Sequence, residues 1–440
     1  MKQLLFMIAF TLTGTAGAVL VDPYLGVLVY YLFAVLRPQF LWEWVLPPDV
    51  RGSYYVGLAA ILGALIQVPL ARAKAKLDDG PGEPAPRTWA APHLWMFALG
   101  AWIAVTYSTA KDRLYAEPWA IEYLKIFVMF AVASRVVRSV RQAWWLVLVA
   151  ATCLCYIAYE VNILYLTQGR LDIFHVGYGG LDNNGAGLML AMGVPLCIAC
   201  WETSVRWWRW GFLLCVPPIV HAVLMTYSRG AMLSLVVVVP LLWWRSRSRV
   251  QLAIGFLLLA LLLPTLAGQE IRARFFSISE NEADKSAQSR RESWRAGYAI
   301  ARDHPVFGVG PRNADRFSLQ YGADLEGRAI HSQYFQIAAD CGFVGLGLYL
   351  VATFSVWSSV RRALSAYRDR VDLEGRRAFG VARAVEGSLA VFFFGATFLS
   401  LEVFELPYLL LLLGAQLSVL RVEAPEPEPR RASAFARCAS

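Results

Sequence analysis

Side chains that could bind an anion and accept a proton are concentrated in one polar stretch of the chain, residues 267–333. It holds the pair Arg290-Arg291 and, close to its end, His331. A guanidinium forms two charge-assisted hydrogen bonds to a phosphate group and stays protonated at any physiological pH. The ordinary pKa of histidine, near 6.5, lets a neutral imidazole take up a proton. These residue types therefore predict a site for an anionic group beside a proton acceptor.

A third arginine reaches this region from a distant part of the sequence. Arg229 lies in Thr226-Tyr227-Ser228-Arg229-Gly230-Ala231, which joins two long apolar runs almost without a linker. An arginine at that depth is costly unless it meets a partner or an anionic ligand. The alternative is an interfacial anchor whose side chain extends to the lipid headgroups. We favour the ligand-binding interpretation because Arg229 and Arg290 are predicted on the same face of the membrane.

The elements that must position these residues are membrane helices. Hydrophobic residues make up 58% of the chain and charged residues only 17%, with 16 Trp. Crossing a bilayer core of about 30 Å takes about 20 apolar helical residues. The composition predicts an all-α, polytopic integral membrane protein of about twelve transmembrane helices. The apolar runs lie near 4–20, 54–71, 91–108, 119–137, 142–160, 183–201, 209–226, 229–244, 249–266, 334–360, 384–402 and 404–420.

The runs divide the chain into four parts. Residues 1–266 are predicted membrane helices with short loops, 267–333 a large helical loop, 334–420 C-terminal membrane helices, and 421–440 a disordered tail. Within the loop, Ser286 to Arg302 has the pattern of an amphipathic helix that ends at Asp303-His304-Pro305. The first 37 residues leave alternatives open. Tyr24 to Leu36 is too short to cross alone, and Met1 to Ala18 is either a span or a cleaved signal peptide.

Arginine-rich short loops orient the chain because such loops stay in the cytoplasm. They lie at 135–141, 245–249 and 361–383. Counting spans from these loops puts three segments on the outer face: 161–182, 227–229 and 267–333. The net charge of +9 is then a topology signal, and no nucleic-acid binding is expected. The chain is expected to lie in a membrane, with membrane lipids as partners.

Three motifs follow one another in and after the polar stretch. They are Arg290 with Trp294, then His304-Pro305-Val306-Phe307-Gly308-Val309-Gly310-Pro311, then His331-Ser332-Gln333-Tyr334 before Asp340-Cys341-Gly342-Phe343-Val344-Gly345. This order and spacing resemble the O-antigen ligase and polymerase superfamily of bacterial envelope glycosyltransferases. Thr226 to Ala231 is similar to the family's Ser/Thr-Arg signature, and Asp182-Asn183-Asn184 resembles its Asn-bearing entry to an earlier span. The resemblance covers roughly residues 180–350.

The resemblance implies a GT-C-like glycosyltransferase of the bacterial inner membrane. It would move an O-antigen glycan from undecaprenyl pyrophosphate to a hydroxyl of lipid A–core at the periplasmic face. A departing pyrophosphate needs fixed cations or a metal. The outer loops show no Asp-x-Asp or His-Asp cluster, so we expect no metal and no cofactor. The expected site comprises His331 as general base; Arg229, Arg290, Arg291 and Arg312 for the pyrophosphate; and Trp294, Asn184 and Tyr334 in support. Gly308-Val309-Gly310 is a further candidate to present backbone N–H groups to the anion.

Other functions use the same donor or the same number of spans. An O-antigen polymerase would add the glycan to a second lipid-linked glycan, and a protein O-oligosaccharyltransferase would add it to a Ser or Thr. A flippase for lipid-linked oligosaccharides is a more distant alternative. A transporter is expected to line its path with ionisable residues inside the spans. Here arginine and histidine gather in an outer loop instead, which favours a transferase.

Overall fold

The protein folds as helices throughout the part of the chain that the computed structural model describes, residues 2–46, 51–78, 89–168, 177–178, 180–204, 207–266, 281–324, 327 and 329–420. The helices of the first half are α1 (Lys2–Leu20), α2 (Pro23–Leu36), α3 (Pro38–Leu41), α4 (Gly52–Asp78), α5 (Ala91–Ser108), α6 (Arg113–Val136), α7 (Val140–Gln168) and α9 (Asn183–Thr203). Those of the second half are α10 (Arg209–Met225), α11 (Arg229–Arg245), α12 (Arg249–Leu266), α14 (Asn281–Asp303), α15 (Asn313–Phe317), the 3₁₀ turn η2 (Ser318–Tyr321), α16 (Gln333–Tyr367), α17 (Leu373–Gly395) and α18 (Glu405–Gln416).

Each predicted apolar run falls on a helix, and the protein is a polytopic membrane protein as expected. Among the described residues, seven helices are long and apolar enough to cross a membrane, and Arg209–Met225 and Arg249–Leu262 are shorter apolar helices. The run at Tyr24–Leu36 forms α2, which has 14 residues and ends where the chain turns at Arg37 (φ +53°) into α3. Only α2 and α3 together, Pro23–Leu41, reach spanning length.

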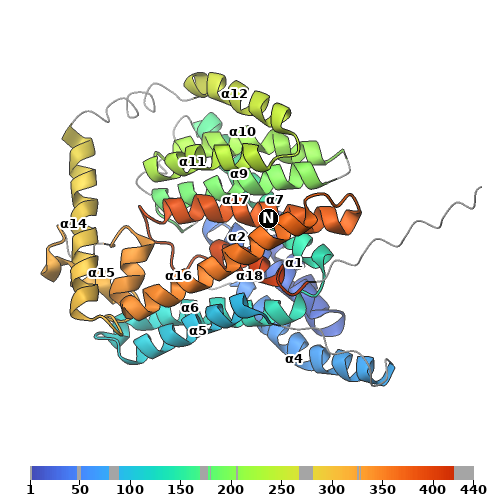
Figure 1. Ribbon diagram of the computed structural model, residues 1–440, viewed down its shortest axis with the longest axis horizontal. Coiled ribbons are helices and arrows are strands. Elements are labelled where there is room, and N and C mark those ends of the chain that lie inside the picture. Colours follow the sequence, from blue (N-terminus) through green and yellow to red (C-terminus); the bar gives the residue numbers. More distant parts are fainter. Residues whose placement is uncertain are drawn as a thin grey trace, which may run out of the picture.

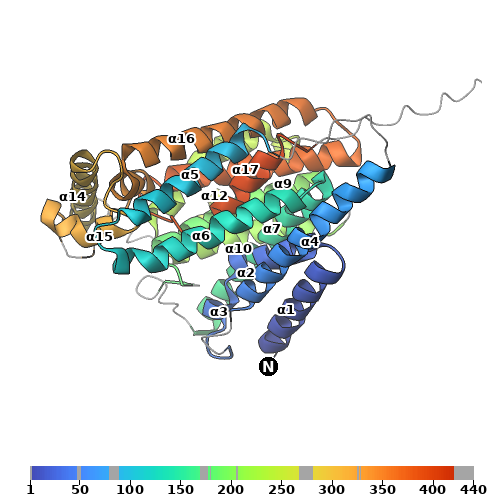
Figure 2. The same cartoon turned by 90° about the horizontal axis from the view of Figure 1, so that it is seen from below.

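Most long helices lie along one direction, and α14 runs across that direction at one end (Figures 1 and 2). The helix predicted at Ser286–Arg302 is α14. It ends at Asp303, because His304 precedes a proline that disfavours further helix. Within the loop predicted to carry the site, the described residues 281–324 are therefore largely helical, and α14 lies at the end at which α16 begins (Figure 1).

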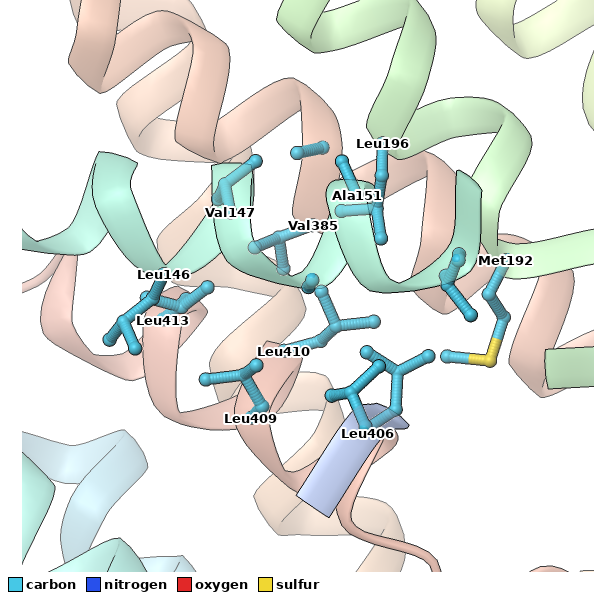
Figure 3. Packing of buried hydrophobic residues seen from close by; sticks show 14 of the residues in the cluster. Leu146, Val147, Ala151, Met192, Leu196, Val385, Leu406, Leu409, Leu410 and Leu413 are labelled. Atoms are coloured by element: carbon cyan, nitrogen blue, oxygen red, sulfur yellow. The ribbon is translucent and has the colours of Figure 1, made fainter. Parts of the chain in front are cut away.

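The hydrophobic core lies around the short helix α18. Every residue of α18 from Leu406 to Gln416 is buried. Figure 3 shows its leucines packed against residues of α7, α9 and α17, namely Leu146, Val147 and Ala151, Met192 and Leu196, and Val385. At about 25 cal/mol per Å² of apolar surface, such fully buried leucines each contribute roughly 1.5–3 kcal/mol. The core thus fixes α7, α9 and α17 relative to one another.

Buried charge joins the helices at the end opposite α14. The Arg383 side chain on α17 is only 3% exposed, and its Nη1 lies 2.5 Å from Glu202 Oε2 on α9. The same nitrogen donates to the carbonyl oxygen of Arg245 at 2.8 Å. Arg245 and Arg361 both contact the carboxylate of Glu386, at 3.3 and 3.2 Å. A charged side chain between membrane helices is costly unless it is paired in this way.

The long helix α16 is interrupted at Gly342, where one turn is opened, and the loop after α14 forms backbone hydrogen bonds with this opened turn. Gly342 has φ +71°, a left-handed conformation that costs other residues free energy. Three backbone hydrogen bonds join loop and helix: Val309 N to Ala339 O (3.0 Å), Gly310 N to Asp340 O (2.9 Å) and Phe343 N to Pro305 O (2.8 Å). A Cβ at Gly342 would lie 2.1 Å from Val306 O. The glycines of the two motifs therefore permit this close backbone contact.

Gly342→Ala is expected to destabilise the protein by at least about 2 kcal/mol, because it combines a left-handed alanine with a backbone clash. Thermal unfolding of the purified protein in detergent measures the effect. Gly347→Ala is the matched control on the same helix, since a Cβ there meets nothing within 4 Å and alanine favours helix. Equal unfolding temperatures for G342A and wild type would contradict the role of the opened turn.

Candidate active site

Arg229 is held at the start of α11 by contacts with the start of α9. Ser228 caps α11, its side chain accepting from Ala231 N, and its hydroxyl donates to Asn184 Oδ1 at 3.0 Å. Asn183 Nδ2 donates to Thr226 O at 3.2 Å. Asn184, predicted to support the site, thus contacts the residue next to Arg229. Its role in catalysis stays a prediction.

Arg290 and Trp294 lie one turn apart on α14. Between them, the Ser293 side chain connects α14 to the segment just before α16. The hydroxyl of Ser293 is buried and donates to Ile330 O at 3.0 Å. Trp294 Nε1 donates to His331 O at 3.1 Å. The tryptophan predicted to support the site is therefore bonded to the backbone of the predicted base.

His331 adopts a left-handed backbone conformation (φ +53°) directly before the cap of α16. Gln336 Oε1 accepts from Ile330 N at 3.2 Å, and Gln336 Nε2 donates to Asp340 Oδ2 at 3.0 Å. Gln333 N lies 2.8 Å from Ala396 O. A non-glycine residue in this conformation persists only where its surroundings determine it, often at functional sites. The imidazole is half-buried.

Phe398, in the turn after α17, lies where these pieces meet. Its ring centroid is 6.3 Å from that of Trp294. A Cβ built on Gly230, the residue after Arg229, would lie 3.5 Å from the Phe398 side chain. One aromatic ring thus separates the start of α11 from α14.

Tyr334, the third predicted supporting residue, donates from its hydroxyl to Phe393 O at 2.8 Å, which holds α16 against α17.

The guanidinium groups of Arg229 and Arg290 come close enough to repel each other. Burial and then the charge of Arg229 lower the pKa of Arg290, and Asp182 opposes this effect. Two half-buried cations this close together, with Asp182 as a nearby carboxylate, make a candidate place for an anion with two or more oxygen atoms. The structure therefore brings together Arg229, Arg290 and the segment of His331.

The turn Gly308-Val309-Gly310 was expected to present N–H groups to the anion, and this prediction was wrong. Gly308 N donates to His304 O at 3.0 Å, and the other two N–H groups bind the opened turn of α16. All three donors are used within the protein. Glycine is required here because a Cβ at Gly308 (φ +66°) would lie 2.4 Å from the backbone of Asp340.

The other two predicted arginines differ in their surroundings. Arg291 is exposed on α14. Arg312 pairs with Asp315 at 2.7 Å, its guanidinium lies 4.8 Å from the ring centroid of Trp119, and its backbone N donates to Asp340 Oδ2. Burial raises the pKa of Asp315, and Arg312 counteracts this by stabilising the carboxylate. Arg312 thus lies in a buried charge cluster distinct from the Arg229–Arg290 pair.

Three contributors to the site were not expected from the sequence: Ser293, Gln336 and Phe398. Gln336 lies three residues after the His331-Ser332-Gln333 run, on the buried side of α16, and its helical spacing to Asp340 was the available signal. Phe398 belongs to a distant turn, and nothing local marks it. Among the described residues, no group of three or more His, Cys, Asp or Glu side chains is arranged as for a metal ion.

These features define a class: a polytopic membrane protein with a composite candidate site for an anion at one end of its helices. Residues 211–350 match the family model described as O-antigen ligase. The matched segment holds Arg229, α14, the His304–Pro311 loop, His331 and the opened turn of α16. The match confirms the predicted resemblance to the O-antigen ligase and polymerase superfamily. It supports glycan transfer of the ligase or polymerase type. No curated protein matches the chain.

Arg312→Met is expected to lower the free energy of unfolding by about 3–5 kcal/mol, because it leaves the carboxylate of Asp315 buried without its partner. The two side chains are only 17% and 4% exposed. Arg316→Met is the control: its pair with Asp112 is 51% and 26% exposed, and such pairs contribute about 1 kcal/mol or less. Thermal unfolding in detergent compares the two variants. Equal losses would show that the Arg312 cluster carries no special stability.

Proposed function

We propose that the protein transfers an O-antigen glycan from undecaprenyl pyrophosphate to a hydroxyl of lipid A–core at the periplasmic face of the inner membrane. The observation that carries this proposal is the Arg229–Arg290 pair, two half-buried guanidiniums whose charges repel each other. Trp294, one turn after Arg290 on α14, donates to the backbone of His331. A pyrophosphate matches such a pair because it offers several anionic oxygens. The match to the O-antigen ligase family supports glycan transfer of the ligase or polymerase type.

The proposed reaction is one displacement at the anomeric carbon of the donor glycan. The acceptor oxygen forms a bond to this carbon as the bond from the carbon to the phosphate oxygen breaks. The electron pair leaves with undecaprenyl pyrophosphate, and the acceptor proton passes to His331. Arg229 and Arg290 bind the pyrophosphate and stabilise the charge that develops on it, a type of effect worth several kcal/mol. A positioned general base contributes about 10²–10⁴-fold in rate.

The surrounding contacts suit this task because they fix the reacting groups before the substrates bind. The left-handed backbone at His331 is held by Trp294 on one side and Gln336 on the other. The start of α9 holds the turn that carries Arg229. Catalysis gains from groups that need no reorganisation during the reaction. Arg291, exposed on α14, remains a proposed helper at the rim, whereas Arg312 is assigned to the structural cluster.

The test uses the purified protein in detergent with an undecaprenyl-pyrophosphate-linked glycan and lipid A–core. We expect the core band to shift to a glycan ladder, equally with and without EDTA. His331→Ala is expected to reduce this transfer about 10²–10⁴-fold while the protein stays folded in the membrane. An elongated lipid-linked glycan with unchanged core would identify a polymerase. Wild-type rates in H331A would exclude the imidazole as the base.

Arg229→Lys and Arg290→Lys keep the charge but lose the planar pair of donors. Each is expected to lower kcat/KM about tenfold or more, because lysine cannot bind two phosphate oxygens in the same geometry. Arg295→Lys, an exposed position on α14, is the control and should retain wild-type activity. The amount of each variant in the membrane is measured first. Full activity of R229K would favour an interfacial anchor over a phosphate ligand.

A further inference from the structure

A second concentration of arginines surrounds a cavity at the other end of the helices. The cavity has a volume of about 660 Å³ and is lined by Arg245, Ser246, Arg247, Ser248, Arg249 and Arg368, among others. Arg368 directly follows α16, whereas His331 lies two residues before its start. Because α16 continues as a regular helix after Gly342, from Phe343 to Tyr367, this part alone spans roughly 37 Å at 1.5 Å per residue. The cavity is therefore separate from the candidate active site.

The lining carries four arginines and no carboxylate. Arg245 contacts Glu386, and the nearby Glu202 is already engaged by Arg383 and Ser246. Arg247 instead donates to backbone carbonyls of Arg368 and Arg370, and its guanidinium lies 4.7 Å from the Phe379 ring centroid. Arg249 donates to Trp244 O at 2.9 Å. Glu202 is near enough to interact with the charge of Arg247, but it already binds Arg383, and four arginines thus line a cavity that no carboxylate lines.

The start of α12 adds to this field. Arg249, Val250 and Gln251 form its first turn, and all three line the cavity. The first N–H groups of a helix have no acceptor inside the helix, and the helix dipole makes this end positive. Ser248 N donates to Ser246 Oγ at 2.8 Å, which fixes the loop before the helix. Backbone and side chains therefore both favour an anion here.

Aromatic and apolar side chains next to the cavity indicate where it lies in the bilayer. Trp243 and Trp244 are 40% and 64% exposed, and Arg249 lies 5.8 Å from the ring centroid of each. Tryptophan and arginine together mark the headgroup level of a membrane. Along α12, exposed apolar side chains continue from the cavity at helical spacing: Val250, Ile254, Leu257, Leu258 and Leu261. This stripe offers a path for acyl chains directly below the charged cavity.

We propose that this cavity binds the phosphate headgroup of an anionic phospholipid, whose acyl chains lie along the exposed stripe of α12. Arginines dispersed over the cytoplasmic loops would orient the chain in the membrane equally well, so orientation does not explain why four of them surround one cavity. Basic pockets between membrane helices bind phospholipid headgroups of this kind. A free phosphate would meet the same charges, but it would make no use of the apolar stripe.

Native mass spectrometry of the protein in detergent tests the proposal with phosphatidylglycerol, phosphatidylcholine and inorganic phosphate as separate probes. We expect phosphatidylglycerol to bind more tightly than the other two. Arg247→Gln with Arg249→Gln should weaken this binding about thirtyfold, since each arginine at a charged membrane surface contributes about fivefold. Arg138→Gln with Arg362→Gln removes the same charge from exposed positions outside the lining. This control should bind phosphatidylglycerol like the wild type.

Three outcomes would overturn the proposal. Equal binding of phosphatidylcholine would show that the cavity does not recognise the negative charge. Inorganic phosphate that binds as tightly as phosphatidylglycerol would identify a soluble anion as the ligand instead of a lipid. Unchanged affinity in R247Q/R249Q would place the bound lipid elsewhere. Because Arg247 and Arg249 are exposed and lie far from His331, none of these outcomes depends on glycan transfer.

Discussion

The candidate site depends on the docking of one loop into one opened helix turn. The loop after α14 donates two backbone hydrogen bonds to α16 and accepts one from Phe343 N, the residue after Gly342. Carbonyl groups freed by the kink would otherwise be buried without donors, which costs more than the bonds themselves contribute. The loop and the kink therefore exist only together. Their docking fixes where α14 ends, and thus where Arg290 and Trp294 lie relative to the start of α16.

Holding Arg229 and Arg290 close together costs free energy, and the rest of the site must offset this cost. Burial and mutual repulsion both disfavour two charged guanidiniums at close range, as the lowered pKa of Arg290 shows. Contacts away from the charges hold them in place: Asn184 and Ser228 on one side, Ser293 on the other. An anionic ligand would relieve the repulsion. A site of this kind is most stable when it is occupied.

Much of the fold and part of the site were predictable from the sequence, for different reasons. Apolar run length identifies membrane helices directly, and the 3.6-residue pattern identified α14. Arg229 and Arg290 were paired through topology, since both were counted onto one face. The roles of Gly308 and Gly310 were not predictable in this way, because a glycine-rich turn fits an anion or a neighbouring backbone equally well. Phe398 was missed because its contacts span distant segments and no local pattern records them.

The buried pair of Arg383 and Glu202 also bears on how the chain is assembled in the membrane. Its two members come from α17 and α9, which are separated by more than a third of the sequence. If α17 entered lipid alone, Arg383 would lack Glu202 and the carbonyl oxygens of Arg245 and Leu242, at a cost of several kcal/mol. Stable insertion of α17 therefore requires α9 and α11 to be already in place. The C-terminal helices depend on earlier ones for their biogenesis, and a protein made without α9 would leave α17 poorly retained in the bilayer.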